Sequence, residues 1–143
     1  MIKDSEVLAG SGPGEGELEA LGRFVSGIDM ESDSEFTVVE VRTVDQAVTT
    51  ASIWGSRQRV RGGSEKVVIL LDNMGPEGGR EASDALVEGG LRSWCILEGS
   101  GGVSRDSLQE WNGSGVDLVS SSSLNRGVVP LDMSMRFGGL IDG

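Results

Sequence analysis

The sequence predicts an α/β fold in which parallel strands alternate with helices. Segments with the pattern of a strand, a loop, a helix and the next strand repeat along the 143 residues. This alternation is typical of parallel strands joined by right-handed crossovers. Hydrophobic residues make up 37% of the chain and aromatic residues only 4%, so the core must consist mainly of Val, Leu, Ile and Ala. Such a core suits strands that are buried on both faces.

The positions of the polar residues make this prediction more specific. Several of them stand at the carboxyl ends of predicted strands, where the active-site residues of a β/α barrel lie. They are Lys3, Glu40, Arg42, Asp72, Glu98, Ser100 and residues 120–122. A complete barrel of eight strands needs about 250 residues, whereas the patterns here predict one strand end and about five strands. We therefore expect an incomplete, TIM-like β/α barrel, with residues 1–143 forming one truncated domain.

The N-terminal segment is expected to contain a strand end, a helix and a complete strand. Residues 1–4 have the pattern of the last residues of a strand. Leu18, Leu21 and Val25 are spaced by three and four residues, which predicts a short amphipathic helix. Residues 36–42 are rich in β-branched side chains and almost continuously apolar, so they predict the first complete strand.

A helix is predicted directly after this strand. Gln46 follows Thr43 by three residues, the spacing of a capping box. The apolar residues that share one face of this helix are Val44, Ala47, Val48 and Ala51. Residues 55–65 are polar and form either a basic ligand loop or a solvated insertion. Their alternating arginines are Arg57, Arg59 and Arg61. We favour the insertion because no apolar or aromatic partner accompanies these arginines.

Residues 66–73 have the pattern of the most strongly buried strand. The helix after them is expected to begin near Pro76, since proline suits the first helical position, and to end at Gly89-Gly90. The next strand, around residues 94–97, contains the only cysteine, Cys95. Its apolar neighbours predict a buried thiol rather than a nucleophile.

The turn after this strand is the strongest candidate for a binding site. Residues 97–104 combine the end of a buried strand with Gly101-Gly102, and the residues that follow, up to Trp111, are expected to be helical. Glycine lets the backbone approach a ligand and adopt positive φ, and a helix N-terminus favours anions. The residues predict a phosphate-binding turn or, alternatively, an ordinary strand-to-helix turn. Two further strands are expected, at residues 116–120 and 131–137.

Charge and composition exclude several classes of function. The net charge is −11, and an acidic chain is a poor nucleic-acid binder because phosphate neutralisation by Lys and Arg dominates that affinity. The chain has no histidine, so it lacks the commonest general base and transition-metal ligand. No apolar run approaches the length of a membrane span, and a single cysteine favours a reducing compartment. We expect a cytoplasmic protein that binds neither nucleic acid nor membranes.

Seven short segments, in order, resemble a known protein family. They are residues 1–4 (MIKD), 39–41 (VEV), 45–47 (DQA), 70–74 (LLDNM), 98–103 (EGSGGV), 117–120 (DLVS) and 130–134 (PLDMS). In these segments the chain resembles the quinolinate phosphoribosyltransferases, also called carboxylating nicotinate-nucleotide pyrophosphorylases. The segments LLDNM, SGG and LDMS are specific when they occur in this order. The resemblance covers nearly the whole chain outside residues 9–35 and 55–65.

The resemblance implies an activity, a fold and a set of site residues. The family transfers phosphoribose from phosphoribosyl pyrophosphate to quinolinate with magnesium, releasing pyrophosphate and CO2 and giving nicotinate mononucleotide for NAD biosynthesis. Its fold is an N-terminal α/β sandwich, expected to be missing here, followed by an incomplete α/β barrel, and its members are dimers or larger oligomers. By resemblance, Lys3 and Asp72 are catalytic, Glu40 and Asp72 contact the ribose, and Asp72 lies near the metal. The residues implied to hold the phosphate are Ser100, Gly101, Gly102, Ser122 and Arg126.

Four departures from the family pattern lead us to expect an impaired enzyme. Ser5-Glu6 stands where the family usually has Asn-His. Arg42 replaces a glutamate expected at the ribose, with no compensating residue in the sequence, and Ser122 replaces a glycine of the phosphate loop. The family's ligands for the two carboxylates of quinolinate lie upstream of the position of Lys3. We therefore expect this chain alone to bind phosphate weakly and to turn over poorly.

Two other functions stay open at this point. One is a non-catalytic partner that supplies barrel surface to a full-length subunit, which Arg42 and the missing N-terminal domain favour. The other is a different phosphate-binding β/α-barrel enzyme, an isomerase or a lyase. That alternative explains the glycine turn but not the ordered segments.

Overall fold

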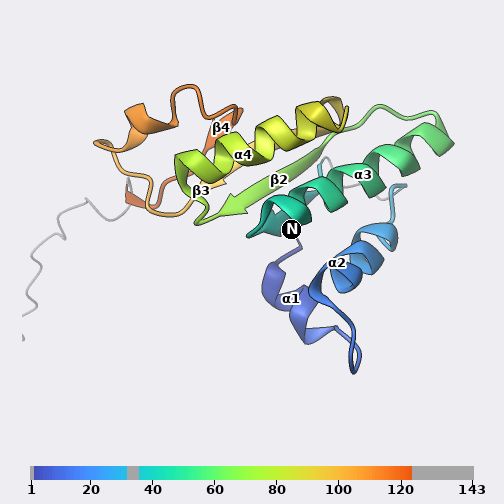
Figure 1. Cartoon of the computed structure of the whole chain (residues 1–143). Helices are drawn as coiled ribbons and strands as arrows, with labels where there is room; N and C mark the ends of the chain where they lie inside the picture. The colour runs from blue at the N-terminus through green and yellow to red at the C-terminus, as the bar shows by residue number, and fades with distance from the viewer. Residues whose placement is uncertain (1, 32–35, 124–143) are drawn as a thin grey trace, which may run out of the picture.

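A parallel four-stranded sheet forms the centre of the molecule (Figure 1). The computed structural model describes residues 2–31 and 36–123. The strands are β1 (Val38–Val41), β2 (Val67–Asp72), β3 (Cys95–Ser100) and β4 (Leu118–Val119), and they lie in this order. Ile2 forms an isolated parallel bridge with Val39 of β1. The predicted α/β class, the parallel strands and the strand end near residues 1–4 are confirmed.

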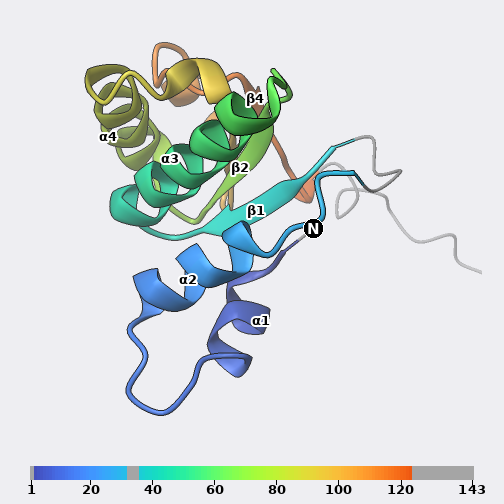
Figure 2. The ribbon, with the colours of Figure 1, turned by 90° about the vertical axis from the view of Figure 1, so that its right-hand side faces the viewer.

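Four α-helices connect and cover the strands. They are α1 (Asp4–Ala9), α2 (Glu17–Ser26), α3 (Val44–Arg61) and α4 (Gly75–Glu88), with short 3₁₀ turns η1 (Arg92–Trp94) and η2 (Leu108–Trp111). Figure 2 shows α3 and α4 lying across the sheet, while α1 and α2 pack together beside β1. The helix α1 was not expected from the sequence. No helix among the described residues is long and apolar enough to cross a membrane.

The start of α3 forms as the sequence predicts. The Thr43 hydroxyl accepts a hydrogen bond from the Gln46 backbone N–H at 3.2 Å, and the Gln46 side-chain oxygen accepts one from the Thr43 backbone N–H. The same Gln46 oxygen accepts a hydrogen bond from the Arg42 backbone N–H at 2.7 Å. These bonds satisfy backbone donors that the first turn of a helix leaves unpaired. They also fix the backbone where β1 ends.

The prediction that residues 55–65 form a polar, solvated insertion is wrong, because α3 continues through Arg61. Its arginines have partners that are remote in sequence. Arg57 donates to the backbone oxygens of Val25 and Ile28, at 2.8 and 2.7 Å, and so caps the end of α2. Arg59 lies 5.1 Å from the ring centroid of Trp94, a cation–π distance. Local sequence gave no sign of these partners, since only the fold brings them together.

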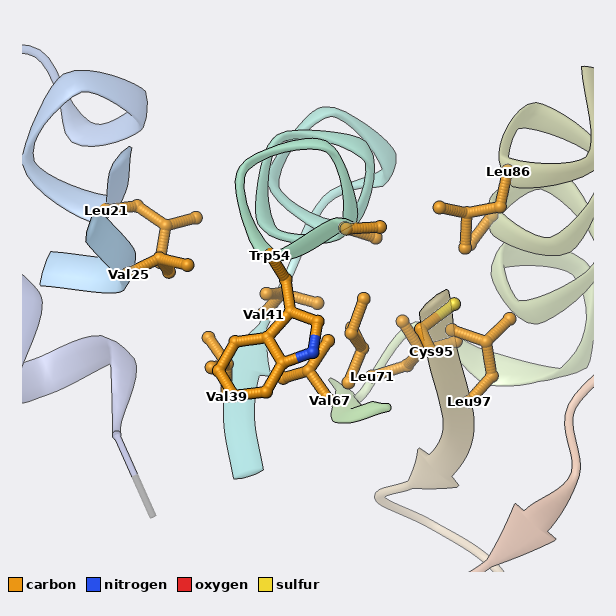
Figure 3. Close-up of a cluster of buried hydrophobic side chains, with 14 of the residues drawn as sticks. Leu21, Val25, Val39, Val41, Trp54, Val67, Leu71, Leu86, Cys95 and Leu97 are labelled. Atoms are coloured by element: carbon orange, nitrogen blue, oxygen red, sulfur yellow. The ribbon is translucent and has the colours of Figure 1, made fainter. Parts of the chain in front are cut away.

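The hydrophobic core lies between one face of the sheet and the helices α2, α3 and α4 (Figure 3). Alternate strand residues point into it, and these include Val39, Val41, Val67, Ile69, Leu71, Cys95 and Leu97. Trp54 from α3 fills the centre, and its indole N–H donates to the backbone oxygen of Glu65 at 2.8 Å. Cys95 is fully buried, and burial raises the pKa of its thiol. This confirms the prediction that Cys95 is a buried thiol.

The opposite face of the sheet is partly exposed among the described residues. The strand register aligns Glu40, Leu70, Glu98 and Leu118 in one row across the four strands. None of these four side chains is buried, and Leu118 on the outermost strand is 53% exposed. The described part of the chain is therefore an open sheet with helices on one face, and the carboxyl ends of its strands lie along one edge.

Candidate phosphate site at the carboxyl ends of the strands

A polar pocket lies where β3 and β4 end. Its volume is about 390 Å³. The residues that line it are Asn73, Gly101, Gly102, Val103, Ser104, Ser120, Ser121, Ser122 and Ser123. They come from three successive turns, those after β2, β3 and β4, and none of them is charged. We call this the glycine–serine pocket.

The two glycines shape one wall of this pocket. Gly101 has φ +84° and Gly102 has φ +63°, a region that other residues rarely adopt. A Cβ on Gly101 would overlap the side-chain oxygen of Asn73 and lie 2.9 Å from the Asn73 Cα atom. The backbone N–H groups of both glycines donate no hydrogen bond to another described residue. Such unpaired N–H groups in a tight turn form a concavity suited to an anion.

The α-helix predicted after the turn is absent. Residues 108–111 form only the 3₁₀ turn η2. The Ser104 hydroxyl accepts a hydrogen bond from the Ser107 N–H at 3.1 Å, and the Ser107 hydroxyl accepts one from the Ser104 N–H at 2.9 Å, which is the reciprocal pattern of a capping box. The chain nevertheless forms only a turn and η2 after these serines, and no α-helix. No helix dipole therefore contributes here, and any anion site depends on the turn itself.

Hydrogen bonds of the serines after β4 stabilise the opposite wall of the pocket. The Ser121 hydroxyl donates to the Val103 backbone oxygen and lies 2.6 Å from the Ser123 hydroxyl oxygen. The Ser120 hydroxyl donates to a carboxylate oxygen of Glu98. Ser122 is exposed and makes no hydrogen bond to another described residue. Its hydroxyl is thus available within the pocket wall.

The predicted residues Ser100 and Asp72 lie beside the pocket rather than in its wall. Ser100 pairs in register with Asp72, and its hydroxyl donates to the Leu71 backbone oxygen at 3.2 Å. Asp72 directly precedes the pocket residue Asn73. Its carboxylate accepts a hydrogen bond from Arg42, with Nε and Oδ2 3.3 Å apart. The expectation that nothing compensates for the charge of Arg42 is therefore wrong, because Asp72 does so across two adjacent strand ends.

The remaining predicted residues lie further along the same edge or outside the described chain. Glu40 belongs to β1, and Lys3 follows the bridge that Ile2 makes beside β1. Lys3 is exposed, and β1, β2 and β3 separate it from β4, which Ser122 follows. Arg126 and the strand predicted at residues 131–137 lie outside the described residues.

Sequence reasoning missed Asn73 as a pocket residue. It is the only non-glycine residue with positive φ among the described residues, at 55°, and its N–H donates to the Ser100 backbone oxygen at 3.1 Å. An asparagine directly after a buried strand was the available signal, since asparagine tolerates this conformation better than most residues. Ser123 was also missed, whereas Ser104, Ser120 and Ser121 lie in the stretches 97–104 and 120–122 that the sequence had indicated.

Comparison with known proteins decides the family. The family model for the C-terminal domain of quinolinate phosphoribosyl transferase matches residues 1–136. The chain belongs to the quinolinate phosphoribosyl transferase family. A "Probable nicotinate-nucleotide pyrophosphorylase (carboxylating)" of Methanothermobacter thermautotrophicus is 31% identical over 140 residues, which cover 98% of this chain and 44% of that protein. A protein of the same name from Archaeoglobus fulgidus is 33% identical over 98 residues, which cover 68% of this chain and 34% of that protein.

The chain thus spans less than half the length of these two relatives. What matches is the C-terminal domain of the quinolinate phosphoribosyl transferase family, and the glycine–serine pocket and Asp72 both lie within the matched residues. The resemblance seen in the seven short segments is confirmed.

Proposed function

We propose that this chain supplies the phosphoribose-binding part of an active site that transfers phosphoribose from phosphoribosyl pyrophosphate to quinolinate. The products would be nicotinate mononucleotide, CO2 and pyrophosphate. The observation that carries this proposal is the glycine–serine pocket, which lies at the carboxyl ends of parallel strands in a chain of this family. A reducing compartment, the cytoplasm, suits its single buried thiol.

The pocket would hold the 5′-phosphate through dipoles rather than through a paired cation. Gly101 and Gly102 present backbone N–H groups, and Ser122 presents a hydroxyl. Donors that are already held in place stabilise an anion without reorganising when it binds. An uncharged lining also predicts modest affinity, in keeping with weak phosphate binding by this chain.

The ribose would lie along the strand ends toward β1. Loss of pyrophosphate from C1 leaves an electron-poor, oxocarbenium-like centre, which positioned carboxylates stabilise without a protein nucleophile. Asp72 stands one residue before the pocket, and Glu40 lies on the next strand. We propose that Asp72 and Glu40 contact the ribose and that Lys3, further along the edge, faces both substrates.

Magnesium bound to the pyrophosphate stays a prediction, but a protein-held site at Asp72 does not fit the described residues. They contain no group of three or more His, Cys, Asp or Glu side chains that could hold a metal ion. One carboxylate oxygen of Asp72 already accepts a hydrogen bond from Arg42. Magnesium requires near-octahedral oxygen ligands, and no step proposed above depends on it.

Isothermal titration of the purified chain with nicotinate mononucleotide tests the proposal. We expect a dissociation constant on the order of a millimolar, which corresponds to about 4 kcal/mol. Nicotinate riboside, which has the same base and sugar but no phosphate, is the matched control and should give no measurable heat. Absence of heat with millimolar nicotinate mononucleotide would contradict the proposal, as would equal affinity for the two compounds.

A partner role is a second candidate, favoured by the open face of the sheet. Leu70 and Leu118 on this face are not buried, and β4 leaves one strand edge unpaired among the described residues. Exposed edges and apolar faces promote association. We expect a homodimer or larger oligomer in light scattering of the purified chain. A monodisperse monomer across the micromolar range would count against both the oligomer and the partner role.

A further inference from the structure

The ion pair between Arg42 and Asp72 joins two adjacent strand ends at the edge where the ribose would bind. The last register pair of β1 and β2 is Val41 with Leu71, so Arg42 and Asp72 are the next residues on each strand. Arg42 Nε lies 3.3 Å from Asp72 Oδ2. The Arg42 backbone is held in place by its hydrogen bond to Gln46 in the capping box of α3. The backbone of Arg42 is therefore fixed by Gln46, and its guanidinium is paired with Asp72.

This pair places a permanent positive charge against one carboxylate oxygen of Asp72, next to any divalent cation that would bind that carboxylate. A guanidinium stays protonated at any physiological pH. It neutralises the charge of the Asp72 carboxylate and repels any divalent cation that approaches it. The described residues offer no group of three or more acidic, His or Cys side chains that would outweigh this repulsion.

We infer that Arg42 is the resident counter-cation of Asp72 and a positioning residue of the site. In this role it orients the Asp72 carboxylate toward the sugar hydroxyls, so that the pocket binds a ribose phosphate without a divalent cation. The inference rests on the proposed function for the identity of the ligand. Its claim about Arg42, Asp72 and metal ions concerns the protein alone.

The alternative is an ordinary surface ion pair. The Arg42 side chain is 54% exposed and that of Asp72 is 26% exposed, and exposed pairs usually contribute little to stability. A purely structural pair would change neither the metal dependence of ligand binding nor the affinity for a metal alone. Those two properties therefore separate the two roles.

The first measurement is calorimetric titration with ribose 5-phosphate, in EDTA and in millimolar magnesium chloride. This ligand carries no pyrophosphate that could bring its own magnesium to the site. We expect wild-type affinity to be unchanged by magnesium. We expect Arg42→Gln to bind about tenfold more weakly in EDTA and to recover part of the loss with magnesium, whereas Arg42→Lys, which keeps the charge, stays independent of magnesium.

Arg80→Gln is the matched control, because Arg80 is an exposed cation on α4 that does not line the glycine–serine pocket. It should behave as wild type in both buffers. Wild-type affinity that rises severalfold with magnesium would overturn the inference, and so would wild-type behaviour of Arg42→Gln in EDTA.

The second measurement needs no sugar phosphate, so it separates the inference from the proposed function. Titration with manganese alone, followed by the loss of the free-ion paramagnetic resonance signal, should show no binding to the wild type up to about a millimolar. Arg42→Glu places a second carboxylate next to Asp72 and should create manganese binding. Manganese binding by the wild type that is lost in Asp72→Asn would overturn the inference, even if ribose 5-phosphate bound as proposed. Absence of ribose 5-phosphate binding in every variant would overturn the proposed function and the positioning role of Arg42, whereas the manganese titration alone would still decide the claim about metal ions.

Discussion

Replacing Gly101 by alanine is expected to abolish binding of nicotinate mononucleotide and to lower the free energy of unfolding by about 2 kcal/mol. Gly101 has φ +84°, where a Cβ atom meets the following backbone. That Cβ would also overlap the side-chain oxygen of Asn73 and lie 2.9 Å from its Cα atom. Asn73 is itself fixed by its hydrogen bond to the Ser100 backbone oxygen. The turn must therefore open, which moves the N–H groups proposed to hold the phosphate.

Gly62→Ala is the control that isolates the cost of the backbone conformation. Gly62 caps the C-terminus of α3 with φ +71°, and a Cβ there would meet nothing within 4 Å. This variant should lose about 1 kcal/mol of stability and keep wild-type ligand affinity. Urea unfolding gives the stability and calorimetry gives the affinity. A Gly101→Ala protein that binds the nucleotide like the wild type would show that the glycine turn is not the phosphate site.

Truncating Trp111 to alanine is expected to lower the free energy of unfolding by about 3 kcal/mol, the largest effect that we predict. Trp111 is 6% exposed and packs over Gly99 at the end of β3. A Cβ on Gly99 would lie 2.8 Å from Cε3 of the Trp111 ring and closer still to Cζ3 and Cη2. Gly99→Ala should therefore cost about 1–3 kcal/mol by overpacking.

A double-mutant cycle tests whether this contact is the cause. Without the indole ring, the added methyl group of Gly99→Ala fills space instead of overlapping an atom. The double variant should therefore be more stable than the sum of the two single effects predicts, by at least about 1 kcal/mol. Urea unfolding of the four proteins provides the measurement. Additive effects would show that Gly99 and Trp111 act independently and that the indole ring is not the reason why position 99 requires glycine.

Much of the fold could be predicted because its signals are local. The capping box of Thr43 and Gln46, the buried run at residues 67–72 and the glycines that end α4 each act within a few residues. Periodicity and capping are properties of one turn or one strand, so the sequence displays them directly. The alternation of these elements then implied a parallel sheet.

Contacts between remote residues could not be predicted in this way. Residues 55–61 resemble a solvated insertion until the end of α2 supplies the carbonyl groups that Arg57 binds. Residues 104–111 have the pattern of a helix start, including the reciprocal bonds of Ser104 and Ser107, but Trp111 packs over Gly99 and only the 3₁₀ turn η2 forms. In both segments, tertiary packing overrides the local pattern.

The candidate site was also predictable only in part, for the same reason. The sequence by itself determined that Gly101 and Gly102 follow a buried strand, that Asp72 ends the preceding one, and that both belong to one family pattern. Only the tertiary structure decided that Asn73 and the serines after β4 close the pocket and that Arg42 pairs with Asp72. The physical reason is that parallel strands bring their carboxyl ends to one edge, while the register between them sets which side chains meet.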